Sequence, residues 1–434
     1  MTPALLVLAP ALVAQDPFSA AAERALRARA GLDTLRVLHF GDSHTGARSF
    51  AATWRAYLQA QFGEGGTGLG LPWLASAGPR CGRSSGWQAH QPTLRNGSDG
   101  LSGPGGSYLE AQRPGERAWV EAPFRRLRLH LLRQPGGGRL RVRVDGREVA
   151  LVDLEGPVEA LCLQPDLAGD GRRLELECLG GAVRLLGLAL ENGPGASYSA
   201  TGTNGAQAAW LLRSDPGVFT AVLSREAPDL LVLAFGTNEA SLGDFDPEAY
   251  RRALRAVLDR FRAAAPGAAL LLLGPPDSVL PKARPGALKE VARIQAELAR
   301  QAGALFVSQQ EAMGGAGSMP AWVVEGLALK DRVHFSAEGY ARLARAGAAA
   351  LLGRLERALP AGDDPRLAKA RPGAFSLPAQ APQLLGRFEP AQAEPATAPR
   401  PIYTFRTEDG RLFITDDPSK VEGLRGSWVG RGPR

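Results

Sequence analysis

The segment LRVLHFGDSH, residues 35–44, decides how the chain begins to fold. Leu35 to Phe40 form a short apolar run of the kind that makes a buried β-strand. The run ends in a Gly-Asp-Ser-His turn, and apolar residues then recur at helical spacing from Ser49 to Phe62. A buried strand, a tight turn and an amphipathic helix together predict the first unit of a parallel α/β sheet.

The same alternation of strands and helices returns in the second half of the chain. Strands that alternate with helices are typical of a parallel sheet covered on both faces. The predicted fold class is therefore α/β, with a three-layer α/β/α domain built on a parallel sheet. Apolar runs predict strands at 230–235, 269–273 and 305–307, and helical spacing predicts helices at 206–213, 246–265, 288–301 and 336–359.

Residues 107–192 follow a different pattern. Polar and apolar residues alternate in short runs separated by turns, as in Arg139–Val144 followed by Asp145-Gly146. This pattern predicts an antiparallel β-sandwich with a solvated face, inserted into the α/β domain. The α/β domain is then discontinuous, with residues 33–106 and 193–359, and we expect its glycine-rich segment 63–106 to be mostly irregular.

The composition sets limits on the function. The chain has 434 residues, 44% of them hydrophobic and 22% charged, which is typical of a globular protein and excludes disorder throughout. The net charge of +7 is spread without a basic block, so we expect no nucleic-acid partner. The five His and three Cys form no CxxC pattern, no HExxH pattern and no Cys/His cluster, so we expect no structural zinc site. Cys162 and Cys178 flank a turn, where they either pair across two strands or stay as free thiols.

Both ends of the chain carry segments outside the α/β domain. Residues 4–14 are an apolar run, too short for a transmembrane segment, that predicts a signal peptide over 1–14 and export to the periplasm or cell envelope. An apolar N-terminal arm is the alternative. Residues 360–400 are rich in Ala and Pro and predict a linker. In residues 401–434, two β-rich runs joined across Asp409-Gly410 predict a hairpin in a small β tail.

Three short motifs lie where a parallel sheet places its functional residues, beyond the carboxyl ends of strands. Ser43 stands at the turn after the first strand, where its hydroxyl is exposed and its backbone N–H can point at an oxyanion. Asn238 follows another strand and can supply a second donor. Asp331 and His334 are spaced so that the carboxylate can orient the imidazole. Singly, such residues are more often caps or turn residues, but together they predict a catalytic centre.

These motifs resemble, in content and in order, the sequence blocks of the SGNH (GDSL-type) hydrolase superfamily. Gly41-Asp42-Ser43 is similar to the nucleophile block, Gly236-Thr237-Asn238 to the asparagine block, and Asp331 with His334 to the closing block. Of the residues next to Ser43, Asp42 is expected to organise the turn. His39 and His44 pack or line the cleft, and Cys81 is incidental.

The remaining block of this superfamily contributes a glycine. Gly205 is the best candidate, with Gly202 as the rival. The resemblance implies a serine esterase in which His334, oriented by Asp331, activates Ser43. It also implies an oxyanion hole made by the N–H groups of Ser43 and Gly205 and by the side chain of Asn238. Such a mechanism needs no metal and no organic cofactor.

The inserted β-sandwich resembles the arrangement in bacterial peptidoglycan O-acetylesterases, where a carbohydrate-binding-like module interrupts the SGNH domain. The resemblance covers residues 33–358 and implies an acetylated cell-wall or extracellular polysaccharide as substrate, with peptidoglycan favoured. A polysaccharide O-acetyltransferase, another SGNH esterase or lipase, and a non-catalytic cell-envelope binding protein are the alternatives. The module itself either binds sugar or is a rigid wall of the site. The C-terminal tail resembles a small bacterial envelope domain of unknown function, which implies an envelope partner, although Phe405 stands where Trp is frequent.

Overall fold

The computed structural model describes residues 16–75, 78–92, 99–361, 364–371, 375 and 377, together with three strands between 402 and 432. The chain divides into two compact units, Met1–Arg387 and Phe388–Arg434. The expected signal peptide, residues 1–14, lies outside the described residues, as does most of the expected linker.

A parallel sheet forms the centre of the first unit, and the α/β prediction is confirmed. Its strands lie in the order β2-β13-β1-β14-β15-β16, and each neighbouring pair is parallel. β14 and β15 are buried along their whole length, because helices cover both faces of the sheet. The bounds are β1 Thr34–Gly41, β2 Glu64–Gly70, β13 Gly195–Gly202, β14 Leu230–Ala234, β15 Ala269–Leu273 and β16 Leu305–Val307.

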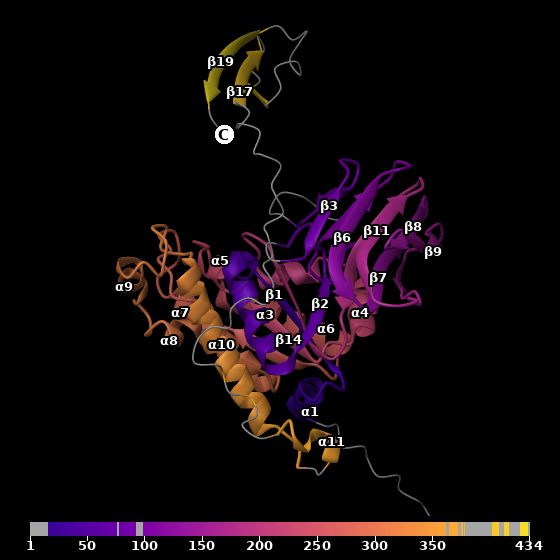
Figure 1. The fold of residues 1–434 in the computed structure, drawn as a ribbon. Helices are drawn as coiled ribbons and strands as arrows, with labels where there is room; N and C mark the ends of the chain where they lie inside the picture. The colour runs from indigo at the N-terminus through magenta and orange to yellow at the C-terminus, as the bar shows by residue number, and fades with distance from the viewer. Residues whose placement is uncertain are drawn as a thin grey trace, which may run out of the picture. The chain divides into compact units, whose positions relative to one another are not determined.

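Two helical layers cover this sheet. On one face, α1, α3 and α10 share a core with Leu35 and Val37 of β1, and Figure 1 shows α3 beside α10 although they are far apart in the sequence. On the other face, α4, α6 and α7 pack on Leu38 and Phe40. The bounds of these helices are α1 Pro17–Arg29, α3 Arg48–Phe62, α4 Pro216–Glu226, α6 Pro247–Ala264, α7 Ala287–Gln301 and α10 Ala337–Arg357.

Helix starts follow the capping residues in the sequence. Asp246 accepts hydrogen bonds from the N–H groups of Glu248 and Ala249 at the start of α6. Ser336 caps α10 in the same way. The segment expected to be helical at 206–213 forms only a short 3₁₀ turn. The short helices are α2 Ser43–Gly46, η1 Ala208–Leu212, α5 Thr237–Ala240, α8 Gln309–Ala312, α9 Met319–Val324 and α11 Pro365–Ala368.

The inserted region forms two antiparallel layers around a core of its own. One layer, in the order β10-β7-β12, joins the central sheet through antiparallel pairing of β12 with β2, and β4 and β5 attach at its side. The other is a separate sheet in the order β3-β6-β11-β8-β9, seen beside the domain in Figure 1. The bounds are β3 Arg80–Arg83, β4 Gln88–His90, β5 Tyr108–Ala111, β6 Arg117–Phe124, β7 Arg126–Arg133, β8 Arg139–Val144, β9 Arg147–Asp153, β10 Glu159–Leu163, β11 Gly171–Cys178 and β12 Val183–Glu191.

The structure differs from the sequence prediction in the glycine-rich segment 63–106. The described residues of this segment form three strands, and β3 and β4 pair with strands of the inserted region. The two antiparallel layers therefore draw on residues from Arg80 onward, and one of them is continuous with the parallel sheet. The alternation of polar and apolar residues does not reveal these strands, because their glycines supply no apolar side chain. Gly66 nevertheless needs to be glycine, since a Cβ there would lie 2.1 Å from the Leu190 carbonyl oxygen.

The α/β domain also extends beyond its expected limits. α1 precedes residue 33 and buries Phe18 and Leu26 in the core. Beyond residue 360, Leu367 and Phe375 join the same core, and the ring of Phe375 packs edge-on against Phe62 at 5.3 Å. The start of the expected linker is therefore part of the domain.

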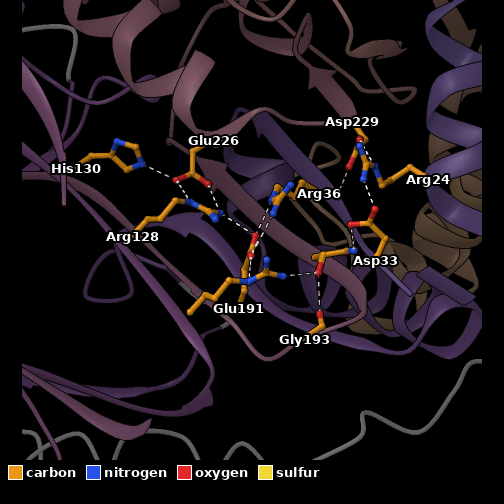
Figure 2. A network of polar contacts seen from close by, with 11 residues as sticks. Arg24, Asp33, Arg36, Arg128, His130, Glu191, Gly193, Glu226 and Asp229 are labelled. Carbon is orange, nitrogen blue, oxygen red and sulfur yellow. Dashed lines mark hydrogen bonds and ion pairs between the residues drawn. The ribbon is translucent and has the colours of Figure 1, made fainter. Parts of the chain in front are cut away.

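A buried network of charges connects the inserted region to the central sheet (Figure 2). Glu191 at the end of β12 accepts hydrogen bonds from Arg36 of β1 and Arg128 of β7. Arg128 continues to Glu226 of α4, which also contacts His130. Because Arg36 lies near the start of β1, this network lies at the sheet edge opposite to the one where Ser43 follows β1.

The second unit contains a three-stranded antiparallel sheet in the order β18-β17-β19. The pairing of β17 with β18 matches the expected hairpin, whose turn at Asp409-Gly410 lies outside the described residues. The third strand was not predicted from the sequence. The bounds are β17 Ile402–Thr407, β18 Leu412–Thr415 and β19 Gly426–Gly432.

Candidate active site

The motifs of the sequence meet at one edge of the sheet. β13, β1 and β14 are parallel neighbours, with Gly41 of β1 level with Gly202 on one side and Ala234 on the other. Ser43, Gly205 and Asn238 lie a few residues beyond the ends of β1, β13 and β14. The carboxyl ends of parallel strands therefore bring the serine, the glycine loop and the asparagine together.

Ser43 is the first residue of the short helix α2. Asp42 caps this helix by accepting the His44 N–H at 2.9 Å, as expected for a residue that organises the turn. Gly41 allows the turn to close, because a Cβ there would lie 2.0 Å from Thr45 Oγ1. The turn is fixed tightly, and Ser43 itself stays partly exposed.

Ser43, His334 and Asp331 form a hydrogen-bonded chain. Ser43 Oγ lies 2.9 Å from His334 Nε2, and His334 Nδ1 lies 2.8 Å from Asp331 Oδ2. Asp331 also accepts the backbone N–H groups of Val333 and His334, at 3.0 Å each. Arg332 closes this loop with φ of +57°, in the left-handed region. An imidazole between a hydroxyl and a carboxylate can take the hydroxyl proton while the carboxylate holds its orientation.

The surroundings of Asp331 favour the ionised form of its carboxylate. Partial burial acts to raise its pKa, but the two backbone N–H groups and the His334 imidazole outweigh this effect, so the pKa of Asp331 is below its ordinary value. The side chains of His334 and Asp331 are 37% and 49% exposed, so substrate and water can reach this side of the site.

The candidate oxyanion donors lie on the other side of Ser43. Asn238 Nδ2 donates a hydrogen bond to the Ala206 carbonyl at 2.9 Å, which holds the asparagine against the loop that carries Gly205. Gly205 has φ of +76°. The rival Gly202 has a packing role, because a Cβ there would lie 2.0 Å from the Gly46 backbone nitrogen. This division of roles favours Gly205 as the donor.

A buried carboxyl group, Glu239, holds the same loop and was missed in the sequence. Glu239 Oε1 accepts the Ala208 N–H at 2.8 Å, so Asn238 and Glu239 bind two backbone groups of one loop. Burial raises the pKa of Glu239 to about 7. Burial, together with the nearby Glu239, raises the pKa of Asp42 to about 8. The Gly-Thr-Asn-Glu motif contains this residue, but its partner lies 31 positions away.

The two other histidines beside the nucleophile are packing residues. His39 is 1% exposed and its Nδ1 lies 2.8 Å from the Tyr198 hydroxyl. His44 is 4% exposed, lies 3.1 Å from the Tyr340 hydroxyl, and its ring centroid is 5.3 Å from that of His334. Burial lowers the pKa of each to about 3, so both are neutral. Neither contacts Ser43 Oγ in the way that His334 does.

Among the described residues, the cysteines form no disulfide and the acidic residues form no metal site. Cys81, Cys162 and Cys178 are free thiols, and Cys162 and Cys178 lie on strands of different sheets. Burial raises the pKa of Cys81 to about 11, so it is protonated at neutral pH. Within the part of the chain that the structure describes, no group of three or more His, Cys, Asp or Glu residues could hold a metal ion. No helix among the described residues is long and apolar enough to cross a membrane.

Comparison with known proteins agrees with this fold. Residues 168–342 match the GDSL-like Lipase/Acylhydrolase family model, a range that contains Asn238, Asp331 and His334 but not Ser43. The family match and the structural similarity described next support a serine esterase of the SGNH (GDSL-type) hydrolase superfamily.

The chain is also similar to proteins of known structure. A structure titled "Peptidoglycan O-acetylesterase in action, 5 min" aligns with a TM-score of 0.64 and 27% identity, covering 76% of this chain and 93% of the other. A family two carbohydrate esterase from Cellvibrio japonicus aligns at 13% identity with a TM-score of 0.29, covering 64% and 98% of the two chains. A lipase/acylhydrolase from Enterococcus faecalis aligns at 19% identity with a TM-score of 0.29, covering 39% and 80%. No curated protein sequence matches the chain.

Proposed function

We propose that this protein removes acetyl groups from a cell-wall or extracellular polysaccharide, with peptidoglycan as the preferred substrate, by a Ser-His-Asp acyl-enzyme mechanism. The observation that carries the mechanism is the continuous chain from Ser43 Oγ to His334 Nε2 and from His334 Nδ1 to Asp331. The observation that supports the substrate is the 27% identity to the peptidoglycan O-acetylesterase structure over most of both chains.

In the first half of the reaction, Ser43 Oγ attacks the acetyl carbonyl carbon and its proton passes to His334 Nε2. The tetrahedral oxyanion accepts hydrogen bonds from the N–H groups of Ser43 and Gly205 and from the Asn238 side chain. When the intermediate collapses, the bond between the acetyl carbon and the sugar oxygen breaks. The sugar oxygen takes the proton from His334, and the acetyl group stays on Ser43.

In the second half, water replaces the sugar. His334 takes a proton from the water, whose oxygen attacks the acetyl carbon of the acyl-enzyme. The same three donors hold the second oxyanion. When this intermediate collapses, the bond between the acetyl carbon and Ser43 Oγ breaks, Ser43 Oγ takes the proton from His334, and acetic acid leaves. Asp331 stays ionised throughout and stabilises the imidazolium that forms in each half.

The proposal includes export of the chain and a docking role for its tail. The apolar run at residues 4–14 supports export to the periplasm or cell envelope, where an acetylated wall polysaccharide is present. The second unit, with its own small sheet, would then bind an envelope partner. Deleting residues 4–14 should keep the protein in the cytoplasm; a deletion variant that is still exported would contradict the signal assignment.

The substrate is tested by acetate release from O-acetylated peptidoglycan and from other acetylated polysaccharides, with wild type and Ser43→Ala compared. We expect Ser43-dependent release from peptidoglycan. Release only from another glycan would reject peptidoglycan and keep the mechanism. If acetate release required added sugar acceptor and the acetyl group appeared on that acceptor, the protein would be a transferase. Polysaccharide binding without any ester cleavage would reject the enzyme assignment.

A further inference from the structure

The imidazole of His334 is fixed at its two nitrogens by Ser43 and Asp331, which lie 2.9 Å from Nε2 and 2.8 Å from Nδ1. Hydrogen bonds to ring nitrogens lie close to the plane of the ring. They fix the two ends of the imidazole, but they oppose only weakly a rocking of the ring about the line that joins the nitrogens. The groups that pack on the sides of the ring therefore decide how precisely Nε2 stays on Ser43 Oγ.

One side of this imidazole is covered by the ring of His44, the residue that follows the nucleophile. The two ring centroids are 5.3 Å apart, and the ring planes are tilted by 43°. This separation is within the range in which aromatic rings pack against one another. Since His44 is 4% exposed and the His334 side chain is 37% exposed, His44 lies on the inner side of the imidazole.

His44 is itself held in place from several directions. Its backbone N–H donates to Asp42 Oδ1 at 2.9 Å, at the start of α2. Its Nδ1 lies 3.1 Å from the hydroxyl oxygen of Tyr340, near the start of α10. Its ring also packs against the rings of Phe335 and Tyr340, with centroids 5.7 and 6.0 Å away. His44 therefore offers a fixed surface to the general base.

The contact between His44 and Tyr340 joins the same two segments as the contact between Ser43 and His334. Ser43 and His44 are neighbours in α2, while His334 and Tyr340 lie on either side of Ser336, the cap of α10. His334 follows Ser43 by 291 positions, and Tyr340 follows His44 by 296 positions. The two segments thus meet twice, and the second contact lies outside the reacting atoms.

The charge of His44 matters as much as its position. Burial lowers the pKa of His44 to about 3, and His334 acts in the same direction, while Asp331 acts against both. Tyr340, which also faces His44, stays protonated because burial and the nearby Asp42 raise its pKa. His44 is therefore neutral at neutral pH, and it places no second positive charge beside the imidazolium that forms on His334 during the reaction.

We propose that His44, held by Tyr340, is a positioning residue for the general base: its neutral ring supports the inner side of the His334 imidazole and keeps Nε2 on Ser43 Oγ. The inference rests on the proposed function and adds one residue to its mechanism. His334 takes up and releases a proton in each half of the reaction, so it has to return each time to the same hydrogen bond with Ser43.

His44 lies apart from the space where a ligand fits. A cavity of about 390 Å³ begins at Thr45 and Gly46, at the other end of α2, and His44 is not among the described residues that line it. Sites for small ligands typically measure roughly 300–1,000 Å³. A substitution of His44 should therefore change kcat and leave KM nearly unchanged.

The test measures kcat, KM and the pH dependence of kcat/KM for the full chain with 4-nitrophenyl acetate. His44→Ala removes the supporting ring, so kcat should fall by roughly ten- to hundredfold, as for a small displacement of a reacting group. Water then reaches the inner side of His334 and stabilises the imidazolium, so the acidic limb of the kcat/KM profile should move to higher pH. His44→Phe restores a neutral ring and should return kcat and the acidic limb toward wild type.

Tyr340→Phe tests the pair even if His44→Ala does not fold, because it removes only the hydroxyl that holds His44. We expect kcat to fall by roughly two- to tenfold, the effect of one neutral hydrogen bond, and the acidic limb to move as in His44→Ala. Tyr198→Phe is the matched control. The Tyr198 hydroxyl lies 2.8 Å from Nδ1 of the equally buried His39, whose ring packs against Trp54 in the core. This control should lose a similar amount of stability in urea denaturation and keep the kcat and the pH profile of wild type.

The outcomes separate this inference from the proposed function. If Ser43→Ala still hydrolyses the ester at the wild-type rate, the proposed mechanism fails and the role of His44 fails with it. If activity depends on Ser43 but His44→Ala keeps the kcat and the acidic limb of wild type, the positioning role is overturned and the mechanism stands. A change confined to KM, or a His44→Phe variant no better than His44→Ala, would also reject support by the ring. Wild-type kinetics in Tyr340→Phe, or an equal shift of the acidic limb in Tyr198→Phe, would overturn the part of Tyr340.

Discussion

The buried charge network in Figure 2 gives a quantitative prediction about how the inserted region is held on the α/β domain. The side chain of Glu191 is 1% exposed. Its carboxylate lies 2.6 Å from Arg36 Nε and 2.8 Å from Arg128 Nη2. The substitution Glu191→Gln keeps the size of the side chain and removes the negative charge. It leaves three arginines, Arg36, Arg126 and Arg128, with one charge partner fewer.

The expected loss of stability follows from the burial of the partners. Breaking a buried ion pair by removing one partner costs about 3–5 kcal/mol, because the other charge is left without compensation. Arg128 keeps its contacts with Glu226, and the Arg36 side chain is 20% exposed. Both effects place the variant at the lower end of the range, so we expect Glu191→Gln to lower the free energy of unfolding by about 3 kcal/mol.

Urea denaturation followed by circular dichroism measures this loss. Glu290→Gln is the matched control, since Glu290 pairs with Arg293 on the surface of α7 and should change stability far less. A Glu191→Gln variant that unfolds like the Glu290→Gln control would refute the reasoning. It would show that the network contributes nothing that a surface pair does not contribute.

The same variant has a defined pH dependence. Burial acts to raise the pKa of Glu191, but Arg36 and Arg128 outweigh it and lower the pKa from 4.5 to about 2. A carboxyl group whose pKa is lower in the folded state stabilises the fold fully above its unfolded pKa and loses this effect as the pH falls through the folded pKa. The stability difference between wild type and Glu191→Gln should therefore be constant above about pH 4.5 and shrink toward about pH 2. A difference that grows as the pH falls in this window would contradict the assignment.

The remaining predictions concern the loop and the turn at the active site. Asn238→Ala should lower kcat by roughly 10²–10³ with little change in KM, because an oxyanion donor is lost. A rise in KM of the same size with an unchanged kcat would contradict this role. Glu239→Ala should lower kcat by up to about 10²-fold by releasing the loop at Ala208, while Glu239→Gln keeps an acceptor and most of the activity. Since burial raises the pKa of Glu239 from 4.5 to about 7, wild type should lose stability relative to Glu239→Gln as the pH rises through that interval, in urea titrations. Gly202→Ala should reduce kcat, because its Cβ would meet the Gly46 nitrogen at 2.0 Å and displace the nucleophile turn; wild-type kinetics would show that the turn tolerates the shift.

The sequence predicts the parts of the fold that have a strong apolar period. The strand at Ala269–Leu273 has the predicted bounds, and the helices capped by Asp246 and Ser336 begin where the capping residues place them. β13 was missed, because its residues Gly195–Gly202 are mostly small and polar. It is nevertheless the strand that carries the glycine loop to Ser43. Small residues are needed there because Gly202 and Gly46 lie in contact.

In the candidate site, too, the sequence predicts some residues and misses others. Ser43, Asn238, Asp331 and His334 could be chosen from short motifs, because each lies at the end of a predictable strand or before a predictable helix. The hydrogen bond from the Ala208 N–H to Glu239 and the cavity next to Gly46 depend on contacts between segments far apart in the chain. A one-dimensional pattern does not contain such contacts, so only the folded chain shows them.

The central claim is that Ser43 carries the acetyl group during turnover. Rapid acid quench of the enzyme mixed with 4-nitrophenyl acetate, followed by mass spectrometry of its peptides, measures this directly. We predict one added acetyl group on the peptide that contains Ser43 and none on the same peptide of Ser43→Ala, which should also lose turnover. Steady turnover by Ser43→Ala, or an acetyl group that forms at a competent rate on another residue, would contradict the account.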